Sequence, residues 1–183
     1  MIRLGLRLTV AGGKEAVTRL ALIAIAVAIG TGLLLATLAA LNAVNAQNAR
    51  YAWLETGYTG SNAPASAATG APVRDALWWR LRADYYQGKQ IGRVDVAATG
   101  AHAPIPPGIG TLPGPGQYDA SPAMATLLRH TPATQLGDRY PGRQVGTIGS
   151  AALPAPNSLI IIIGDSVADL SHQHDARLVT TIT

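Results

Sequence analysis

The sequence predicts a membrane-anchored α+β protein, in which one N-terminal transmembrane helix is followed by a small mixed α+β extracytoplasmic domain. Three observations indicate this class. Residues 20–41 form a long apolar run without a charged side chain. Basic residues gather on the N-terminal side of that run. Residues 73–183 carry short strand-like and helix-like patterns that are separated by Pro- and Gly-rich loops.

The apolar run is long enough to cross a membrane. Its 22 residues, LALIAIAVAIGTGLLLATLAAL, include no charged residue, no proline and no amide side chain. As a helix they extend about 33 Å, and the hydrocarbon core of a bilayer is about 30 Å thick. A helix also satisfies every backbone N–H and C=O group within the segment, as the interior of a membrane requires. Residues 20–41 are therefore predicted to be a transmembrane helix.

The flanking charges predict the orientation of this helix. Four basic residues precede it, Arg3, Arg7, Lys14 and Arg19, against the single acid Glu15. On the other side, the first basic residue is at position 50. Because basic flanks stay in the cytoplasm, we expect residues 1–19 to be a cytoplasmic amphipathic segment. Residues 42–183 are then extracytoplasmic, and the protein lies in the cell membrane.

A cleaved signal peptide is the main alternative to a permanent anchor. Residues 44–46, Val-Asn-Ala, would suit a small-residue cleavage site before Gln47. The apolar region of a signal peptide is about 7–15 residues long, however, and this run is longer. We therefore favour a retained span.

Small residues recur at every fourth position of the predicted span. They are Ala24, Ala28, Gly32, Ala36 and Ala40. Such a row lets a second helix approach closely in lipid, so it predicts a helix-packing face. The alternative is that an alanine-rich composition produces the row by chance.

Composition limits the classes of function that remain. The chain has 183 residues, of which 48% are hydrophobic and 13% charged. Its net charge of +4 comes largely from the first 19 residues, because residues 42–183 carry ten basic and nine acidic side chains. This distribution is a topology signal, and we expect no nucleic-acid partner. Cysteine is absent, so the core must hold the outer domain together without disulfides.

Residues 42–72 connect the span to the outer domain. A helix-compatible pattern continues to about position 56, which predicts an extension of three or four turns. Residues 57–72 are Gly, Ser, Ala, Asn and Pro in the main, as in a linker. The α+β domain is expected to start near Val73 and to occupy residues 73–183. Because the chain ends on a strand-like segment without a second span, we expect this domain to be incomplete.

Alternating apolar and polar residues predict the strands of this domain. Residues 77–82 and 91–97 read as two antiparallel strands with one solvated face, joined by a turn at residues 87–89. Further strands are predicted at residues 145–148, at the continuous apolar run 159–163, which suits a central strand, and at residues 178–183.

A helix and a crossing segment complete the predicted elements. Residues 102–117 contain five prolines and four glycines, which predicts an extended segment with few hydrogen bonds. Ser121 followed by Pro122 predicts a helix N-terminus, since a serine hydroxyl caps the helix and proline suits its first position. The helix is expected to cover residues 123–129 and to end before Pro132.

Residues 160–167, IIIIGDSV, resemble the block of GDSL-type esterases that carries the nucleophilic serine. Asp169 and His172 even mimic the acid and base of that family. Those partners come from a distant loop, however, whereas here Ser166 and His172 are six residues apart. We interpret the motif as a Gly-Asp turn after a buried strand, and we predict no catalytic residue.

The sequence contains no complete motif for a metal site or a nucleotide site. His172, His174 and Asp175 suit zinc as ligand types, but no third position is specified, and we interpret them as a polar loop. Residues 12–14, Gly-Gly-Lys, lack the other elements of a phosphate-binding loop. Residues 108–110, Gly-Ile-Gly, are not followed by a helix start. We expect no cofactor, so any energy must come from a partner.

Short motifs in a consistent order carry a family resemblance. They are residues 4–8 (LGLRL) with 12–13 (GG), the Ala/Leu-rich span, 45–50 (NAQNAR), 93–97 (RVDVA), 106–109 (PPGI), 112–116 (LPGPG), 120–123 (ASPA) with 127–128 (LL), 136–142 (LGDRYPG), 145–149 (VGTIG) and 159–164 (LIIIIG). In this order they resemble the N-terminal portion of actinobacterial FtsX-like permeases, the MacB-type ABC transporter subunits.

The resemblance implies a permease subunit, or its N-terminal fragment, whose first helix leads into an extracytoplasmic α+β domain. It implies a separate cytoplasmic ABC ATPase as partner, with other permease transmembrane helices and membrane lipid around the span. Such proteins transmit the ATPase cycle mechanically to the outer domain and have no catalytic residues of their own. The later spans of the family are missing from this sequence. The alternative is a single-span or signal-peptide-exported binding domain without a transport role.

Overall fold

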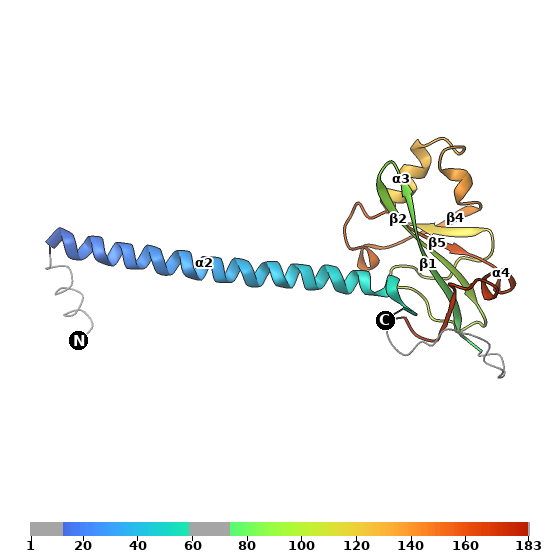
Figure 1. Ribbon diagram of the computed structural model, residues 1–183, viewed down its shortest axis with the longest axis horizontal. Helices are drawn as coiled ribbons and strands as arrows, with labels where there is room; N and C mark the ends of the chain where they lie inside the picture. The colour runs from blue at the N-terminus through green and yellow to red at the C-terminus, as the bar shows by residue number, and fades with distance from the viewer. Residues whose placement is uncertain (1–12, 59–73, 183) are drawn as a thin grey trace. The chain divides into compact units, whose positions relative to one another are not determined.

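The computed structural model describes residues 13–58 and 74–182, which form parts of two compact units (Figure 1). The first unit is Met1–Ala46 and the second is Gln47–Thr183. The predictions made for residues 1–12, 59–73 and 183 lie outside the described residues. They include most of the amphipathic N-terminal segment and most of the linker.

One helix dominates the first unit. Helix α2 (Gly13–Ala52) is 40 residues long and continues into the first residues of the second unit. Its sequence is rich in Ala and Leu, which are strong helix formers, and contains no proline. Its large apolar side chains are exposed, for example Leu22 at 61% and Leu34 at 61%. The helix is long and apolar enough to span a membrane. The predicted helix over residues 20–41 and its extension are thus confirmed as helix.

A mixed six-stranded sheet organises the second unit (Figure 1). Its strand order is β4-β3-β5-β2-β1-β6. The strands are β1 (Leu77–Tyr86), β2 (Lys89–Ala98), β3 (Gln117–Ala120), β4 (Arg143–Thr147), β5 (Ile160–Gly164) and β6 (Arg177–Val179). The strand predictions hold for β1, β2, β4 and β5. Strand β3 was not predicted, and β6 is shorter than predicted.

Strands β1 and β2 form the predicted antiparallel hairpin. The register pairs Trp79 with Val96 and continues to Tyr86 opposite Lys89. Gln87 and Gly88 make the two-residue turn, with φ of 48° and 75°. Two positive φ angles match the tight turn whose twist suits a hairpin. Both strands are longer than the predicted ranges.

Strand β5 lies at the centre of the sheet, as its unbroken apolar sequence predicts. It runs parallel to β2 on one side and antiparallel to β3 on the other, and all five of its residues are buried. The chain crosses close to Gly164, the last residue of the strand. A Cβ atom at this position would collide with the carbonyl oxygens of Pro113 and Gly114.

Two short α-helices flank the sheet. Helix α3 (Pro122–His130) begins as predicted, with Ser121 Oγ accepting a hydrogen bond of 3.2 Å from the amide of Met124. Helix α4 (Val167–Ser171) was not predicted, since its five residues are too few to show a helical period. Among the described residues there are also three 3₁₀ turns: η1 (Trp53–Glu55), η2 (Gly137–Arg139) and η3 (Ser150–Ala152).

The two faces of the sheet are covered differently. On one face, which we call face A, a single core cluster surrounds Trp79, Val94 and Ile162. Trp53 and Leu54 of η1 belong to this cluster, so residues upstream of Val73, the expected start of the domain, contribute to the core. The Pro- and Gly-rich segment that precedes β3 adds apolar residues to the same cluster.

The opposite face, face B, carries two separate apolar clusters. Helix α3 covers one cluster, which includes Met124 and Ile161. Helix α4 covers the other, in which Leu170 packs with Ala97. Between the clusters, face B was predicted to be solvated, but Asp95 is only 1% exposed there. The prediction fails because arginine side chains of β1 and β2 fold over this carboxylate.

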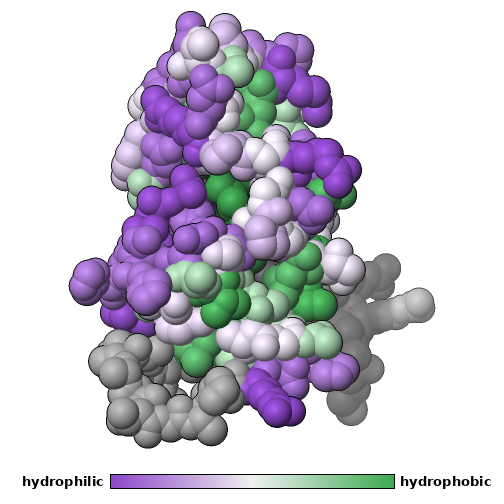
Figure 2. All heavy atoms as spheres, turned by 90° about the vertical axis from the view of Figure 1, so that its right-hand side faces the viewer, coloured by the Kyte–Doolittle hydropathy of each residue, from purple (hydrophilic) through white to green (hydrophobic). Residues whose placement is uncertain are grey.

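The surface of the second unit differs from that of the apolar helix. One side of it shows hydrophilic residues over much of its area, with hydrophobic residues in small separate patches (Figure 2). Isolated apolar patches of this kind are normal for a water-exposed domain.

Candidate functional site

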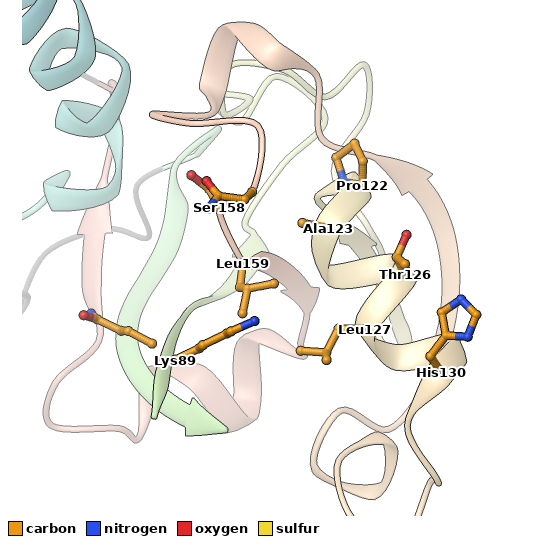
Figure 3. A pocket seen from close by; sticks show the side chains of 10 residues that line it. Lys89, Pro122, Ala123, Thr126, Leu127, His130, Ser158 and Leu159 are labelled. Carbon is orange, nitrogen blue, oxygen red and sulfur yellow. The ribbon is translucent and has the colours of Figure 1, made fainter. Parts of the chain in front are cut away.

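A groove beside α3 in the second unit has a volume of about 800 Å³ (Figure 3). Cavities that hold small ligands are typically about 300–1,000 Å³. Ala123 and Leu127 of α3 form one wall, and Leu159, directly before β5, contributes to the other. Lys89, the first residue of β2, brings the charged group.

Local structure explains why these residues meet. The tight turn at Gln87 and Gly88 places Lys89 at the end of the hairpin. Ser121 Oγ caps α3 and also donates a 2.6 Å hydrogen bond to the carbonyl oxygen of Ser158. One serine hydroxyl therefore ties the start of α3 to the segment before β5. This contact sets the positions of two walls of the groove.

The groove is cationic, since its lining residues include Lys89 and His130 but no acid. Figure 3 shows the Lys89 side chain extending into the groove toward Leu159 and Leu127. Within residues 13–58 and 74–182, the Lys89 ammonium makes no hydrogen bond or ion pair. An unpaired ammonium beside leucine side chains is complementary to a ligand that is apolar and carries one anionic group.

A second, smaller hollow lies beside the segment that precedes β5. It has a volume of about 170 Å³ and shares Gln90, Ser158 and Leu159 with the groove. Its far wall includes Tyr51 and Leu54.

Face B carries a network of arginines and aspartates between its two apolar clusters. Asp95 lies 2.7 Å from Arg93 Nε and 2.9 Å from Arg82 Nη2. The Arg82 contact is an ion pair without the alignment of a hydrogen bond. Further along, Arg80 lies 2.7 Å from Asp175. Most of these charges are thus paired with one another, which indicates a structural role.

Asp84 continues this network at the end of β1. The Tyr140 hydroxyl donates a 2.6 Å hydrogen bond to it, and Arg139 lies 3.3 Å away. Partial burial by itself would raise the pKa of Asp84. The hydrogen bonds from the Tyr140 hydroxyl and the Tyr85 amide, together with the charge of Arg139, have a larger effect, so the pKa is lowered. Burial and the Asp84 carboxylate raise the pKa of Tyr140 far above its ordinary value, so it stays a neutral donor.

Asp119 is a buried aspartate. Among the described residues its Oδ1 atom has neither a hydrogen bond nor an ion pair. It lies on β3, is 4% exposed and faces the backbone of Gly146 on β4. A Cβ atom on Gly146 would occupy the space of its side chain. Burial raises the pKa of the Asp119 carboxyl, because the charged form loses water without gaining a partner.

The Gly-Asp-Ser motif lies where the sequence analysis expects it, directly after the buried strand β5. Ser166 caps α4, since its Oγ accepts a 3.0 Å hydrogen bond from the amide of Asp169. The same hydroxyl donates to Asp169 Oδ2 at 2.6 Å. In the described part of the chain, no hydrogen bond joins Ser166 to a histidine. The contacts of Ser166 are therefore those of a helix cap.

The polar segment after α4 shows no arrangement of ligands around a metal. His172 and His174 are exposed, and Asp175 is held by Arg80. Partial burial acts to raise the pKa of Asp175, but the hydrogen bond from Arg80 outweighs it and lowers the pKa. Across the described residues, no three His, Cys, Asp or Glu side chains are grouped to bind a metal ion.

The row of small residues lies along α2 in the first unit. Ala24, Ala28, Gly32, Ala36 and Ala40 are exposed, and nothing lies within 4 Å of a Cβ atom built on Gly32. Residues spaced by four follow a ridge that is inclined to the helix axis. The row therefore suits a second helix that crosses at an angle, as small-residue contacts in membranes commonly do.

Comparisons with protein-family models, with curated proteins and with solved structures return no match for this chain.

Sequence reasoning missed the residues of the groove. Lys89 was identified only as a turn residue, and Leu127 and Leu159 only as parts of a helix and a strand. The lining comes from three segments that are far apart in the chain, so no local spacing marks it. The available signal was the position of a lysine between a turn and an apolar strand, which is too common to be specific.

Proposed function

We propose that this chain is a permease subunit, or the N-terminal portion of one, of an FtsX-like ABC transporter. In this proposal it couples a cytoplasmic ATPase to the extracytoplasmic α+β domain. The observation that carries the proposal is helix α2, which exposes apolar side chains over a length sufficient for a bilayer and continues into the second unit. The excess of basic residues before the span supports a cytoplasmic N-terminus.

The end of α2 supports a mechanical role. Trp53 and Leu54 follow its last turn and are 2% and 1% exposed within the face A core. Trp53 Nε1 donates a 3.0 Å hydrogen bond to the carbonyl oxygen of Ala152, and its ring meets Trp79 edge to face at 5.8 Å. Because close-packed cores transmit displacement, a shift of residues 47–54 would move the sheet with them.

The second candidate is a single-span binding domain without a transport role. The groove beside α3 favours it, because a cationic cavity of ligand size is sufficient for binding and needs no ATPase. The two candidates differ in what must accompany the span, since only the permease requires an ATPase and neighbouring helices.

Single cysteines test the orientation on which the permease proposal depends. The chain has no cysteine, so each introduced thiol is labelled without background. With a cytoplasmic N-terminus, Ser150→Cys reacts in intact cells with a membrane-impermeant maleimide, and Glu15→Cys reacts only after the cells are opened. The reverse pattern would exclude an extracytoplasmic second unit.

Purification with the partner separates the two candidates. The tagged full chain is extracted from membranes of its source cell in mild detergent, and co-purified proteins are identified by mass spectrometry. The permease proposal predicts an ABC ATPase in the wild-type sample. A chain whose residues 20–41 are replaced by polyleucine should lose it. Absence of any ABC ATPase from the wild-type sample favours the single-span binding domain.

A further inference from the structure

Strand β1 is longer than the strand that covers its outer edge. Strand β6 pairs with residues 77–79 of β1, whereas β1 runs on to Tyr86. Within the described chain, residues 80–86 therefore have no neighbouring strand on the side away from β2. An unpaired strand edge presents a row of N–H and C=O groups to any chain that can extend the sheet.

The two ends of the sheet differ in their protection. Strand β4, at the opposite end, has five residues, follows a proline at position 141, and pairs with β3 through a shifted register. Strand β1 pairs with β2 over all ten residues without a shift, and residues 80–86 contain no proline. Short length, proline and bulges commonly protect an edge from further pairing. The open edge of β1 has none of these protections.

The hydrogen-bond pattern of the hairpin shows which groups of this edge point outward. Gly92 lies opposite Ala83, and its amide donates a 2.8 Å hydrogen bond to the carbonyl oxygen of Leu159, on the side away from β1. Residues directly opposite in an antiparallel pair either bond each other or both turn away. Ala83 therefore turns its N–H and C=O groups outward, as does Leu81 two residues earlier. These four groups have no hydrogen-bond partner among the described residues.

Tyr85 has the same backbone orientation, but side chains cover its polar groups. The amide of Tyr85 donates a 2.7 Å hydrogen bond to Asp84 Oδ1, and Arg139 donates one of 3.1 Å to its carbonyl oxygen. Both of these side chains are partly exposed. Contacts of charged side chains that water reaches are weak, so a neighbouring strand can replace them with backbone hydrogen bonds.

The side chains of this edge complement a second copy of the same edge. When two β1 strands pair antiparallel about Ala83, Arg82 of each copy faces Asp84 of the other on face B. Arg82 shares the carboxylate of Asp95 with Arg93, so two guanidinium groups face one acid within the chain. A second acid across the edge would balance this excess, and opposite charges directly across two strands stabilise a sheet.

Charge also excludes the neighbouring registers. Sliding one copy by two residues sets Arg82 opposite Arg82 in one direction and Asp84 opposite Asp84 in the other, and like charges in this position are destabilising. Sliding by one residue sets outward-pointing backbone groups opposite groups that point inward, so the ladder cannot form. Pairing about Ala83 avoids both faults.

On face A the same register covers an exposed aromatic ring. Tyr85 is 58% exposed, and it would lie opposite Leu81 of the second copy. Leu81 and Ala83 line a hollow of about 450 Å³, whose wall includes Tyr51 and Tyr58. Each copy would thus place its Tyr85 ring over the hollow of the other, and pairs of aromatic and aliphatic side chains across strands are favourable.

We propose that two copies of this chain associate by antiparallel pairing of their β1 edges about Ala83, which joins two six-stranded sheets into one. A two-fold axis at Ala83 relates the copies, so the contact closes at a dimer. The proposal goes beyond the permease function and does not depend on it, since it concerns only the backbone and side chains of the second unit.

Oxidative crosslinking tests the proposal in membranes that contain the full chain. The chain has no cysteine, so Ala83→Cys provides a single thiol. In the proposed register the two Cα atoms at position 83 lie about 5.5 Å apart, within reach of a disulfide. A slide by two residues separates them by about 8 Å, which is too far. With copper phenanthroline, Ala83→Cys should give about tenfold more disulfide-linked dimer than Val145→Cys, an exposed position on β4.

Charge reversal makes the result specific to the register. Asp84→Lys or Arg82→Glu, added to Ala83→Cys, sets like charges opposite each other twice and should lower the yield of dimer about tenfold. When the two variants are expressed together with different tags, opposite charges face each other again across the edge. The mixed dimer should then recover the yield of Ala83→Cys, which a variant that fails to fold could not do.

A variant on face A tests the same edge without changing a charge. Tyr85→Ala removes a largely exposed side chain, so the thermal transition of the second unit should be unchanged. On the Ala83→Cys background it should lower the yield of dimer about tenfold, because the ring no longer covers the hollow. Ile105→Ala, which removes an exposed apolar side chain elsewhere in the second unit, is the matched control and should leave the yield unchanged.

Three outcomes would overturn the proposal. The first is a yield of dimer from Ala83→Cys no higher than that from Val145→Cys. The second is a yield that neither the charge variants nor Tyr85→Ala reduce, which would mean random collision or another register. The third is a disulfide between Ala83→Cys and a different protein in place of the dimer, which would mean that a foreign strand covers the edge.

Discussion

Residues 20–41 of α2 and strand β5 are both uninterrupted apolar runs, but their side chains meet opposite surroundings. Leu22, Ile29 and Leu34 of α2 are 58–61% exposed, whereas Ile161 and Ile162 of β5 are fully buried. Both runs are apolar, although α2 is rich in Ala and Leu whereas β5 consists of four isoleucines and a glycine. The five residues of β5 pack against apolar side chains on both faces of the sheet. The apolar side chains of α2 are not covered by other described residues.

This contrast shows which apolar surface the described chain leaves exposed. Exposed apolar area of this extent is unfavourable in water, by about 25 cal/mol for each Å². The second unit resolves the problem internally by covering face A and most of face B. Helix α2 is long and apolar enough to span a membrane, in which lipid or other helices would cover its side chains.

The largest effect on the free energy of unfolding is expected when one apolar side chain is truncated in each run. Ile162→Ala should lower the free energy of unfolding of the second unit by about 3 kcal/mol, because it leaves a cavity in the centre of the sheet. Leu34→Ala should change it by less than about 0.5 kcal/mol. All three tryptophans lie in the second unit, so their fluorescence during denaturation of the full chain reports this unfolding. Equal costs for the two variants would contradict the contrast.

A second prediction compares a buried ion pair with an exposed one on face B. Asp95→Asn should cost about 2 kcal/mol, because Arg82 and Arg93 lose the carboxylate that neutralises them in a largely buried setting. Asp175→Asn removes the partner of Arg80 at a side chain that is 48% exposed, and should cost less than about 1 kcal/mol. Chemical denaturation followed by tryptophan fluorescence measures both. A larger cost at Asp175 would be the contrary result.

A third prediction concerns Asp119, the buried acid of β3. Asp119→Asn should stabilise the second unit by about 1 kcal/mol at pH 7, because it removes a buried charge without a partner. The raised pKa of Asp119 means that the folded state holds its proton more tightly than the unfolded state does. The stability of the wild type relative to the variant is thus greatest below the unfolded pKa, and it falls as the pH rises through the folded pKa.

Thermal unfolding of both proteins from pH 4 to pH 8 checks this sign. The advantage of Asp119→Asn should shrink toward the acidic end. Asp138→Asn, at an exposed position, is the matched control and should follow the wild type at every pH. An advantage that does not change with pH would mean that the carboxyl of Asp119 does not titrate differently in the folded state.

The smallest expected effect tests what covers the helix. Gly32→Ile places a branched side chain in the row of small residues while it keeps the span apolar, so membrane insertion should be unaffected. It should weaken helix association by about 1 kcal/mol or less, whereas Leu34→Ile, which lies off the row, should change little. A membrane two-hybrid reporter at matched expression measures the association. Equal signals for wild type and both variants would leave lipid alone as the cover of α2.

The sequence by itself determined those features that depend on neighbours along the chain. The apolar length of residues 20–41 predicts a helix, because only a helix satisfies its own backbone in lipid. Alternation and a two-residue turn predict the hairpin of β1 and β2, and Ser121 with Pro122 marks the start of α3. Each of these depends on hydrogen bonds or periodicities that close within a few residues.

Only the tertiary structure decided which segments meet. The order β4-β3-β5-β2-β1-β6 inserts β5 between β2 and β3, which are consecutive strands in the chain, and no local pattern specifies such a choice. The burial of Asp119, and with it the raised pKa of its carboxyl, depends on β4 and β5, which follow later in the chain. The groove around Lys89 forms for the same reason, since burial and charge pairing depend on distances in space, which the spacing of residues along the chain does not contain.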